Sequence, residues 1–252
     1  MATARMGLAL ATALSLAACA APPAPPPDDP ADKALLDDFH RAVYGSERPA
    51  PGGHLAKWEI PIRAALVGAG QADHRAAAER HLADLAALTG LDVAEAPRES
   101  ANLLIFFAAD PAEAARRHRG LYAHRIADAR RFDALLAGME PDSTCFGFLW
   151  GGWPSGQGID FAVVFIRTDR GARTVQGCLV QETTQALGLL HDLDPDADSI
   201  FSDSGRQVEL TERDRLLLRL LYDPRLKPGM GWAGAESLAR TALQDLRKAP
   251  PQ

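Results

Sequence analysis

The chain has 252 residues, 47% of them hydrophobic and 24% charged, which is the composition of an ordinary globular protein with one sizeable core. This balance excludes a low-complexity or largely disordered chain. The formal net charge is −6 and lysine and arginine are dispersed, so the basic stripe of a nucleic-acid binder is missing and no nucleic-acid partner is expected.

Residues 1–18 follow the pattern of a secretory signal. Arg5 gives a positive start, residues 7–16 form an apolar run, and small residues precede Cys19. The sequence that ends in Cys19 resembles a bacterial lipobox. This resemblance implies that Cys19 becomes a lipidated N-terminus that anchors the mature chain to a membrane. An ordinary cleaved signal with an incidental cysteine is the alternative.

These features predict a signal peptide over 1–18, a lipidated cysteine with a proline-rich tether over 19–32, and a single domain over 33–252. The expected location is the bacterial cell envelope, with the domain lipid-anchored and facing the periplasm. Ala20 follows Cys19 in place of the aspartate that marks retention in the inner membrane, which favours the outer membrane.

Apolar periodicity predicts an α+β domain. Trp58, Ile60 and Ile62 alternate as in a strand, whereas Leu82 and Leu85 recur at helical spacing. In chain order we expect a helix around Leu35–Val43, a strand over Trp58–Leu66, a helix over Ala76–Leu88, a strand over Asn102–Phe107, a helix over Pro111–Leu136, a strand over Ile159–Thr168, and helices over Val180–Leu187, Thr211–Tyr222 and Ala235–Leu246. This order predicts a mixed β-sheet with packed helices and no internal repeat.

The glycine-rich segment before the predicted Ile159 strand contains Trp150 and Trp153. Exposed tryptophans would make this loop a binding platform, but packing of a tryptophan on the sheet is the default expectation. A set of histidines is expected to lie solvated on the surface: His74, His81, His118 and His124.

The segment QETTQALGLLHD, residues 181–192, has the spacing of the zinc-protease motif HExxHxxGxxHD. In that motif, two histidines at i and i+4 lie on one helical face, and a third binds the metal beyond a glycine turn. Here Gln181 and Gln185 occupy the first two ligand positions. A carboxamide offers only a neutral oxygen that competes poorly with water, so tight zinc binding is not expected. We expect the two amides to form an internal network with the following loop.

The other positions of the motif are retained. Glu182 stands at the position of the general base, Gly188 at the turn, His191 at the third ligand position and Asp192 directly after it. Glu182 is the catalytic candidate if the domain is active, and an ordinary polar helix residue otherwise. His191 is a metal ligand, a proton-transfer group, or a structural histidine bonded to Asp192 or to a backbone carbonyl.

The acidic loop that follows partly matches a calcium-binding loop. Oxygen-bearing side chains stand at five positions of that pattern: Asp192, Asp194, Asp196, Asp198 and Asp203. The match is incomplete because Ala197 occupies the position where the sharp turn needs glycine. Two alternatives remain: the loop binds calcium as a cofactor, or it is an acidic turn that binds no metal.

The residues after the motif resemble those of matrixin-like metzincins. In that family a turn beneath the metal carries a methionine, and Phe201 stands at the corresponding position here. The run Leu210–Tyr222 resembles the helix that follows this turn. The resemblance implies a metzincin-like fold, with a mixed sheet, a motif helix, a C-terminal helical part and a degenerate metal site.

A closer resemblance is to the bacterial lipoproteins grouped as domain of unknown function 2927. The segments that carry it are Trp58–Arg63, Cys178, Ser199–Asp203 and Leu221–Met230, and it extends over about 55–235. It implies a fold rather than an activity, because a fold alone does not determine function.

If Cys19 is lipidated, Cys145 and Cys178 remain as an even pair in an oxidising compartment. We therefore expect a disulfide between them, with two buried free thiols as the alternative. The bridge would pin the segment before the Trp150 loop to the start of the motif helix.

Two classes of function compete. The preferred hypothesis is a membrane-anchored, non-catalytic binding or assembly module, whose partner is an envelope protein or a peptide that binds by strand addition. This function needs no cofactor. The alternative is a metallohydrolase that acts as a peptidase, with zinc held by His191 and Asp192 and with Glu182 as the base.

Overall fold

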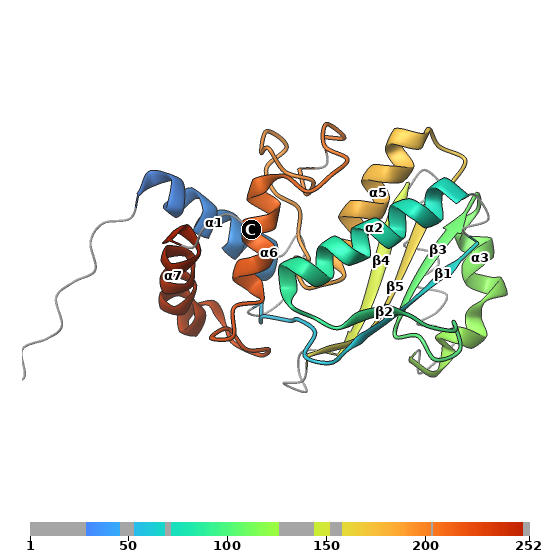
Figure 1. Ribbon diagram of the computed structural model, residues 1–252, viewed down its shortest axis with the longest axis horizontal. Coiled ribbons are helices and arrows are strands. Elements are labelled where there is room, and N and C mark those ends of the chain that lie inside the picture. Colours follow the sequence, from blue (N-terminus) through green and yellow to red (C-terminus); the bar gives the residue numbers. More distant parts are fainter. Residues whose placement is uncertain are drawn as a thin grey trace, which may run out of the picture.

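The computed structural model describes residues 29–45, 53–68, 72–125, 144–151, 158–202 and 204–248. Within these ranges the chain forms a mixed β-sheet with packed helices, which confirms the predicted α+β class (Figure 1). The predicted signal peptide, Cys19 and most of the tether lie outside the described residues.

The sheet has five strands in the order β2-β1-β3-β5-β4. Their bounds are Ile62–Val67 for β1, Val93–Glu95 for β2, Leu103–Ala108 for β3, Cys145–Gly151 for β4 and Ile159–Arg167 for β5. Neighbouring strands pair in parallel except at one edge, where β4 is antiparallel to β5. The edge strand is thus the one strand of reversed direction in the sheet.

Helices cover both faces of this sheet (Figure 1). Their bounds are Pro30–Tyr44 for α1, Ala72–Thr89 for α2, Pro111–Arg117 for α3, Ala172–Gln185 for α5, Glu212–Leu221 for α6 and Trp232–Lys248 for α7. One face carries α2 and α5, and the opposite face carries α3. The helices α1, α6 and α7 pack together at one end of the molecule, and α6 also contacts α2.

The strands are buried on both faces because their side chains alternate between two apolar clusters. In β3, Leu103, Ile105 and Phe107 point toward the side of α2 and α5, whereas Leu104 and Phe106 point toward α3. This explains why β3 reads in the sequence as a continuous apolar run, as is usual for a parallel strand covered by helices on both sides.

Several element boundaries differ from the prediction. The helix α3 ends at Arg117 instead of continuing to Leu136, and two short 3₁₀ turns follow it. The hydroxyl of Tyr122 donates to the carbonyl of Ala115, so the chain folds back onto the helix end. Residues 126–136, the rest of the predicted helix, lie outside the described residues.

The helix α5 begins at Ala172, eight residues before the predicted start, and α1 begins at Pro30, inside the predicted tether. The strand predicted to start at Trp58 begins only at Ile62. Trp58 instead makes a single bridge to Ile159 and is buried, with 1% of its surface exposed.

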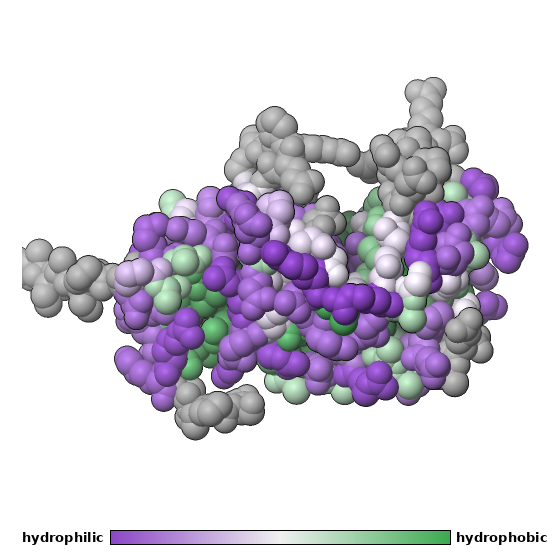
Figure 2. Space-filling model, turned by 90° about the horizontal axis from the view of Figure 1, so that it is seen from above, coloured by the Kyte–Doolittle hydropathy of each residue, from purple (hydrophilic) through white to green (hydrophobic). Residues whose placement is uncertain are grey.

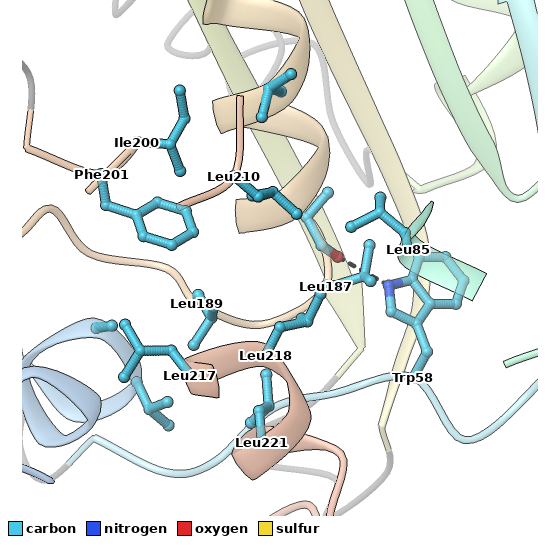
Figure 3. Packing of buried hydrophobic residues seen from close by; sticks show 14 of the residues in the cluster. Trp58, Leu85, Leu187, Leu189, Ile200, Phe201, Leu210, Leu217, Leu218 and Leu221 are labelled. Atoms are coloured by element: carbon cyan, nitrogen blue, oxygen red, sulfur yellow. Dashed lines mark hydrogen bonds between the residues drawn. The ribbon is translucent and has the colours of Figure 1, made fainter. Parts of the chain in front are cut away.

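Trp58 belongs to an apolar cluster beneath the C-terminal end of α5 (Figure 3). Leucine side chains of α6 and the buried ring of Phe201 belong to the same cluster and come from later parts of the chain. The indole Nε1 of Trp58 donates to the carbonyl of Ala186 at 2.8 Å, the interaction drawn as a dashed line. The cluster therefore fixes the point where the motif helix ends.

Trp58→Phe is expected to lower the free energy of unfolding by about 1 to 3 kcal/mol, because the buried carbonyl of Ala186 loses its donor. Urea denaturation measures the loss. Trp232→Phe is the matched control, since Trp232 is only half-buried and contacts aromatic rings. Equal losses in the two variants would contradict a specific role for the indole hydrogen bond.

The surface seen from above is mostly hydrophilic, and apolar colour shows at the end of the molecule where α1 and α7 lie (Figure 2). None of the helices in the described ranges combines the length and the apolar character that crossing a bilayer requires.

Candidate functional site

The helix α5 presents Gln181 and Gln185 on one face, and both side chains reach the same carboxylate. Their Nε2 atoms donate to Oδ1 of Asp192, at 3.2 Å from Gln181 and 2.9 Å from Gln185. The i and i+4 spacing of the motif explains the shared face. The two positions that bear imidazoles in the zinc motif thus form an amide network with the following loop, as the sequence indicated.

The loop reaches this position through a sharp turn at Gly188. Its φ angle is +120°, and a Cβ atom built on it would lie 2.0 Å from the carbonyl oxygen of Ala56. The hydroxyl of Tyr222 donates to the carbonyl of Leu187 at 2.9 Å and accepts the backbone N–H of Trp58 at 3.1 Å. Glycine is therefore required where the chain turns back toward α5.

Beyond the turn, the loop is tied to α1. The backbone N–H of His191 donates to the carbonyl of Ala42 at 3.1 Å. This contact places His191 and Asp192 next to the end of α5, within the same loop that the two amides hold. Asp192 is also near enough to Glu182 for its charge to affect that carboxyl group.

Glu182 faces the edge strand from α5. A Cβ atom built on Gly147 of β4 would lie 3.4 Å from Oε2 of Glu182, so the carboxyl group lies directly against this glycine. No group in the described part of the chain hydrogen-bonds this carboxyl. Burial, assisted by the negative charge of Asp192, raises the pKa of Glu182 to about 8. The group is therefore a protonated acid at neutral pH.

Glu182→Gln is expected to make stability less dependent on pH. The folded-state pKa of about 8 lies above the ordinary value of 4.5, so between these values the native state keeps a proton that the unfolded state releases. Stability of the parent chain must fall as pH rises through this window. The variant should match the parent near pH 5 and exceed it by on the order of 2 kcal/mol near pH 9.

Thermal and urea unfolding of both chains across this pH range tests that expectation. Glu212→Gln serves as the control, because Glu212 is exposed and the substitution makes the same change of charge. Parallel stability curves for the parent and Glu182→Gln would contradict the raised pKa.

The predicted disulfide is confirmed. Cys145 at the start of β4 and Cys178 in α5 are bonded, with their Cα atoms 5.6 Å apart. Cys178 lies one helical turn before Glu182, and Cys145 lies two residues before Gly147 on the same face of the strand. The bridge thus fastens the edge strand to the motif helix and keeps Gly147 opposite Glu182.

The turn that contains Phe201 is held by a buried carboxylate, that of Asp214. Phe201 has no exposed surface, and Asp214 of α6 is equally buried. Oδ1 of Asp214 accepts the hydroxyl of Ser199 at 2.5 Å, and Oδ2 accepts the backbone N–H groups of Ile200 and Thr211 at 3.0 and 2.8 Å. Asp214 thus joins the turn to the first residues of α6.

The sequence contained a signal for part of this arrangement. Thr211 and Asp214 form a capping box, in which each side chain accepts the backbone N–H of the other residue. The spacing Thr-x-x-Asp before an apolar run indicates such a cap. The bonds from Asp214 to Ser199 and Ile200 join residues 14 and 15 positions apart and carry no local signal.

The side chains around Asp192 do not fit a tight zinc site. Carboxamide nitrogens donate to Asp192 Oδ1, and the remaining candidate ligand is the single imidazole of His191. Zinc in proteins favours several imidazole or thiolate ligands in a tetrahedral arrangement. In the described ranges, no group of three or more His, Cys, Asp and Glu side chains is placed to hold a metal ion.

The carboxylates of the predicted calcium loop have separate partners. Asp194 Oδ1 accepts the backbone N–H of Asp196 at 3.0 Å, and Asp198 Oδ1 accepts Nε2 of Gln207 at 2.6 Å. Asp192 is held by the glutamines of α5, and Asp203 lies outside the described residues. The structure does not bring the described members of this set around one centre.

Of the predictions for the other tryptophans and for the histidines, the one for Trp150 is confirmed and the one for His81 is wrong. Trp150 packs against Phe161 of β5 with ring centroids 5.6 Å apart, as expected for a tryptophan on the sheet. Trp153 lies outside the described residues. The prediction of a solvated His81 is wrong: its side chain is buried, and Nε2 lies 3.2 Å from the hydroxyl of Thr184. Burial lowers the pKa of His81 to about 4.

The remaining histidines differ in exposure. His74 stacks on Phe107, and His118 lies half-buried against Phe106, so neither is fully solvated. His124 is exposed as predicted.

Sequence reasoning also missed Lys57, which is buried beside the site. Its Nζ donates to the carbonyls of Leu221 at 3.0 Å and Asp223 at 3.1 Å, at the C-terminal end of α6. Burial, with a smaller effect of Lys227, lowers the pKa of Lys57 to about 8. A lysine that closes a helix end is favourable there, but nothing in the local sequence distinguishes it from a surface lysine.

The fold and site define an α+β protein whose helix α5 carries a carboxamide–carboxylate network formed by Gln181, Gln185 and Asp192. The model of the family described as "Protein of unknown function (DUF2927)" matches residues 32–241, and the chain belongs to this family, as the sequence segments predicted. No curated protein and no solved structure matches the chain.

Proposed function

We propose that the chain is a membrane-anchored, periplasm-facing lipoprotein whose domain is a non-catalytic binding module on a metzincin-like framework. The observation that carries the proposal is the shared acceptor Asp192. Gln181 and Gln185 both donate to it, so the two helical ligand positions are occupied by a closed internal network. Such a network stabilises the loop and leaves no imidazole pair on the helix.

Three features of the fold support a metzincin-like framework. The sheet ends in an antiparallel strand beside the motif helix, Gly188 turns the chain after that helix, and the buried Phe201 lies in a turn before α6. Gly188 and Phe201 are positions at which the sequence resembles the metzincins. The proposal therefore treats α5 as a former metal-binding helix that now has a structural role.

The edge strand β4 supports a binding role. Among the described residues β4 pairs with β5 alone, so its outer edge has backbone donors and acceptors for an added strand. Gly147, in the middle of β4, exposes no side chain between this edge and Glu182. An extended segment of an envelope protein, or a peptide, fits this edge as partner.

The lipid anchor is tested by Cys19→Ser. If Cys19 is acylated, the variant should move from the membrane fraction to the soluble fraction, because it loses the buried acyl chains. A parent chain that is already recovered without membranes would contradict the anchor. Cys178→Ser makes the same change of side chain and should leave the chain in the membrane fraction.

The absence of catalysis is tested with unstructured protein substrates. The full chain should release no fragments above the level of the Glu182→Gln variant at pH 6 to 9. Peptidase activity that Glu182→Gln abolishes would refute the proposal and support the metallohydrolase alternative. That alternative is favoured by one observation, the carboxyl of Glu182, which faces the edge strand with no hydrogen-bond partner in the described part of the chain.

Calcium-dependent folding through the Asp192 loop is a weaker candidate. A rise of the melting temperature in calcium over that in chelator would support it, because a ligand that binds only the native state stabilises it.

A further inference from the structure

A cavity lies between α2 and the first half of α5, away from the Asp192 network. Its volume is about 480 Å³, within the range of small-molecule sites. Phe107, near the carboxyl end of β3, lines it together with Val175 and Leu179 of α5. In sheets with parallel strands, ligands bind preferentially outside the carboxyl ends of the strands.

Two arginines line this cavity, and neither has a carboxylate partner within the described ranges. Arg80 of α2 makes no hydrogen bond or ion pair in the described part of the chain. The guanidinium of Arg173 in α5 donates to the backbone carbonyl of Arg206, which fixes its position, and it forms no ion pair with the residues that the structure describes. Guanidinium groups recognise carboxylates and phosphates through paired N–H donors.

The ion pairs that other arginines form distinguish them from Arg80 and Arg173. The chain carries more acidic than basic residues, 33 against 27, and its exposed arginines commonly bond to nearby carboxylates. Arg63 bonds to Asp92, for example, and Arg75 bonds to Glu95. Two arginines from two helices, which line one cavity and have no such partner among the described residues, therefore offer charge to a ligand.

The rest of the lining limits the chemistry of that ligand. The ring of His74 stacks on Phe107, with centroids 5.4 Å apart and planes 8° apart, and provides a flat apolar wall. Asp73 also lines the cavity and opposes a ligand of high negative charge. The α5 helix begins beside it without an acidic residue in its first turn, which adds a weak attraction for an anion.

We propose that this cavity binds a small organic anion, in which one phosphate or carboxylate group contacts Arg80 and Arg173 and an apolar body lies against His74 and Phe107. The site is separate from the Gln181 network, and its occupation does not depend on whether that network is catalytic.

The test is calorimetric titration of the full chain in detergent with phenyl phosphate and with benzoate. At least one should bind, and the stronger of the two identifies the preferred acid group. Arg80→Gln and Arg173→Gln should each weaken its binding by about tenfold or more, because each removes a hydrogen bond to a charged group. Added salt should also weaken it.

Arg41→Gln is the matched control, since Arg41 is an exposed arginine of α1 that does not line the cavity, and it should bind like the parent. Benzyl alcohol tests the apolar body of the ligand alone, and inorganic phosphate tests the acid group alone. Each should bind more weakly than the preferred aryl anion. No binding of either aryl anion at millimolar concentration would overturn the proposal. Binding that survives Arg80→Gln combined with Arg173→Gln would overturn it equally.

Discussion

Gly188→Ala is expected to lower the free energy of unfolding by about 3 to 5 kcal/mol, among the largest effects of any single methyl group in this chain. Two effects combine. The φ angle of +120° is costly for a residue with a Cβ atom, and that atom would lie 2.0 Å from the carbonyl oxygen of Ala56. The backbone must shift where Tyr222 and Trp58 hold the turn. Urea denaturation of the variant and the parent measures the difference.

Gly90→Ala separates the two effects. Gly90 follows the end of α2 with a φ angle of +72°, and a Cβ atom built on it meets no atom within 4 Å. Its substitution should cost only about 1 kcal/mol, from the backbone conformation alone. If Gly188→Ala is no more harmful than Gly90→Ala, the contact with Ala56 does not constrain the turn.

The second large effect is expected at Asp214. Asp214→Ala should cost about 3 to 5 kcal/mol, because several buried or partly buried donors lose their acceptor at once and α6 loses its cap. The donors are the hydroxyl of Ser199 and the backbone N–H groups of Ile200 and Thr211. The turn that buries Phe201 should loosen as a result. Denaturation by urea gives the energy, and amide hydrogen exchange shows whether the loss begins at this turn.

Glu212→Ala provides the control for Asp214→Ala. Glu212 is an exposed acidic residue in the same first turn of α6, so its removal makes the same change of net charge and helix-end electrostatics. The expected cost is below about 1 kcal/mol. Comparable losses for the two variants, or unchanged exchange at Ile200 and Phe201, would show that the buried bonds of Asp214 are not what holds the turn.

The sequence predicted the buried strands and most helices because their signals are local. The run Leu103–Ala108 is wholly apolar, and α6 has a capping box followed by leucines. The strands β2 and β4 were not predicted. Val93–Glu95 spans only three residues and depends on its pairing with β1. In β4, Phe146, Phe148 and Trp150 alternate as in a strand, but the glycine-rich segment that begins at Trp150 favours a loop in the sequence.

At the site, too, the features with a local signal could be predicted, and those that depend on packing between elements could not. The i and i+4 spacing of Gln181 and Gln185 predicts a shared helical face, and the structure places Asp192 as their common acceptor. The approach of Glu182 to Gly147 could not be predicted, because it depends on how β4 lies against α5. Nor could the burial of His81, which follows from the packing of α2 on α5.

The most direct test of the account is the zinc content of the full chain, purified without added metal and measured by elemental analysis. Because Gln181 and Gln185 donate to Asp192, the predicted result is far less than one zinc per chain. One tightly held zinc ion per chain, lost in His191→Ala, would contradict it.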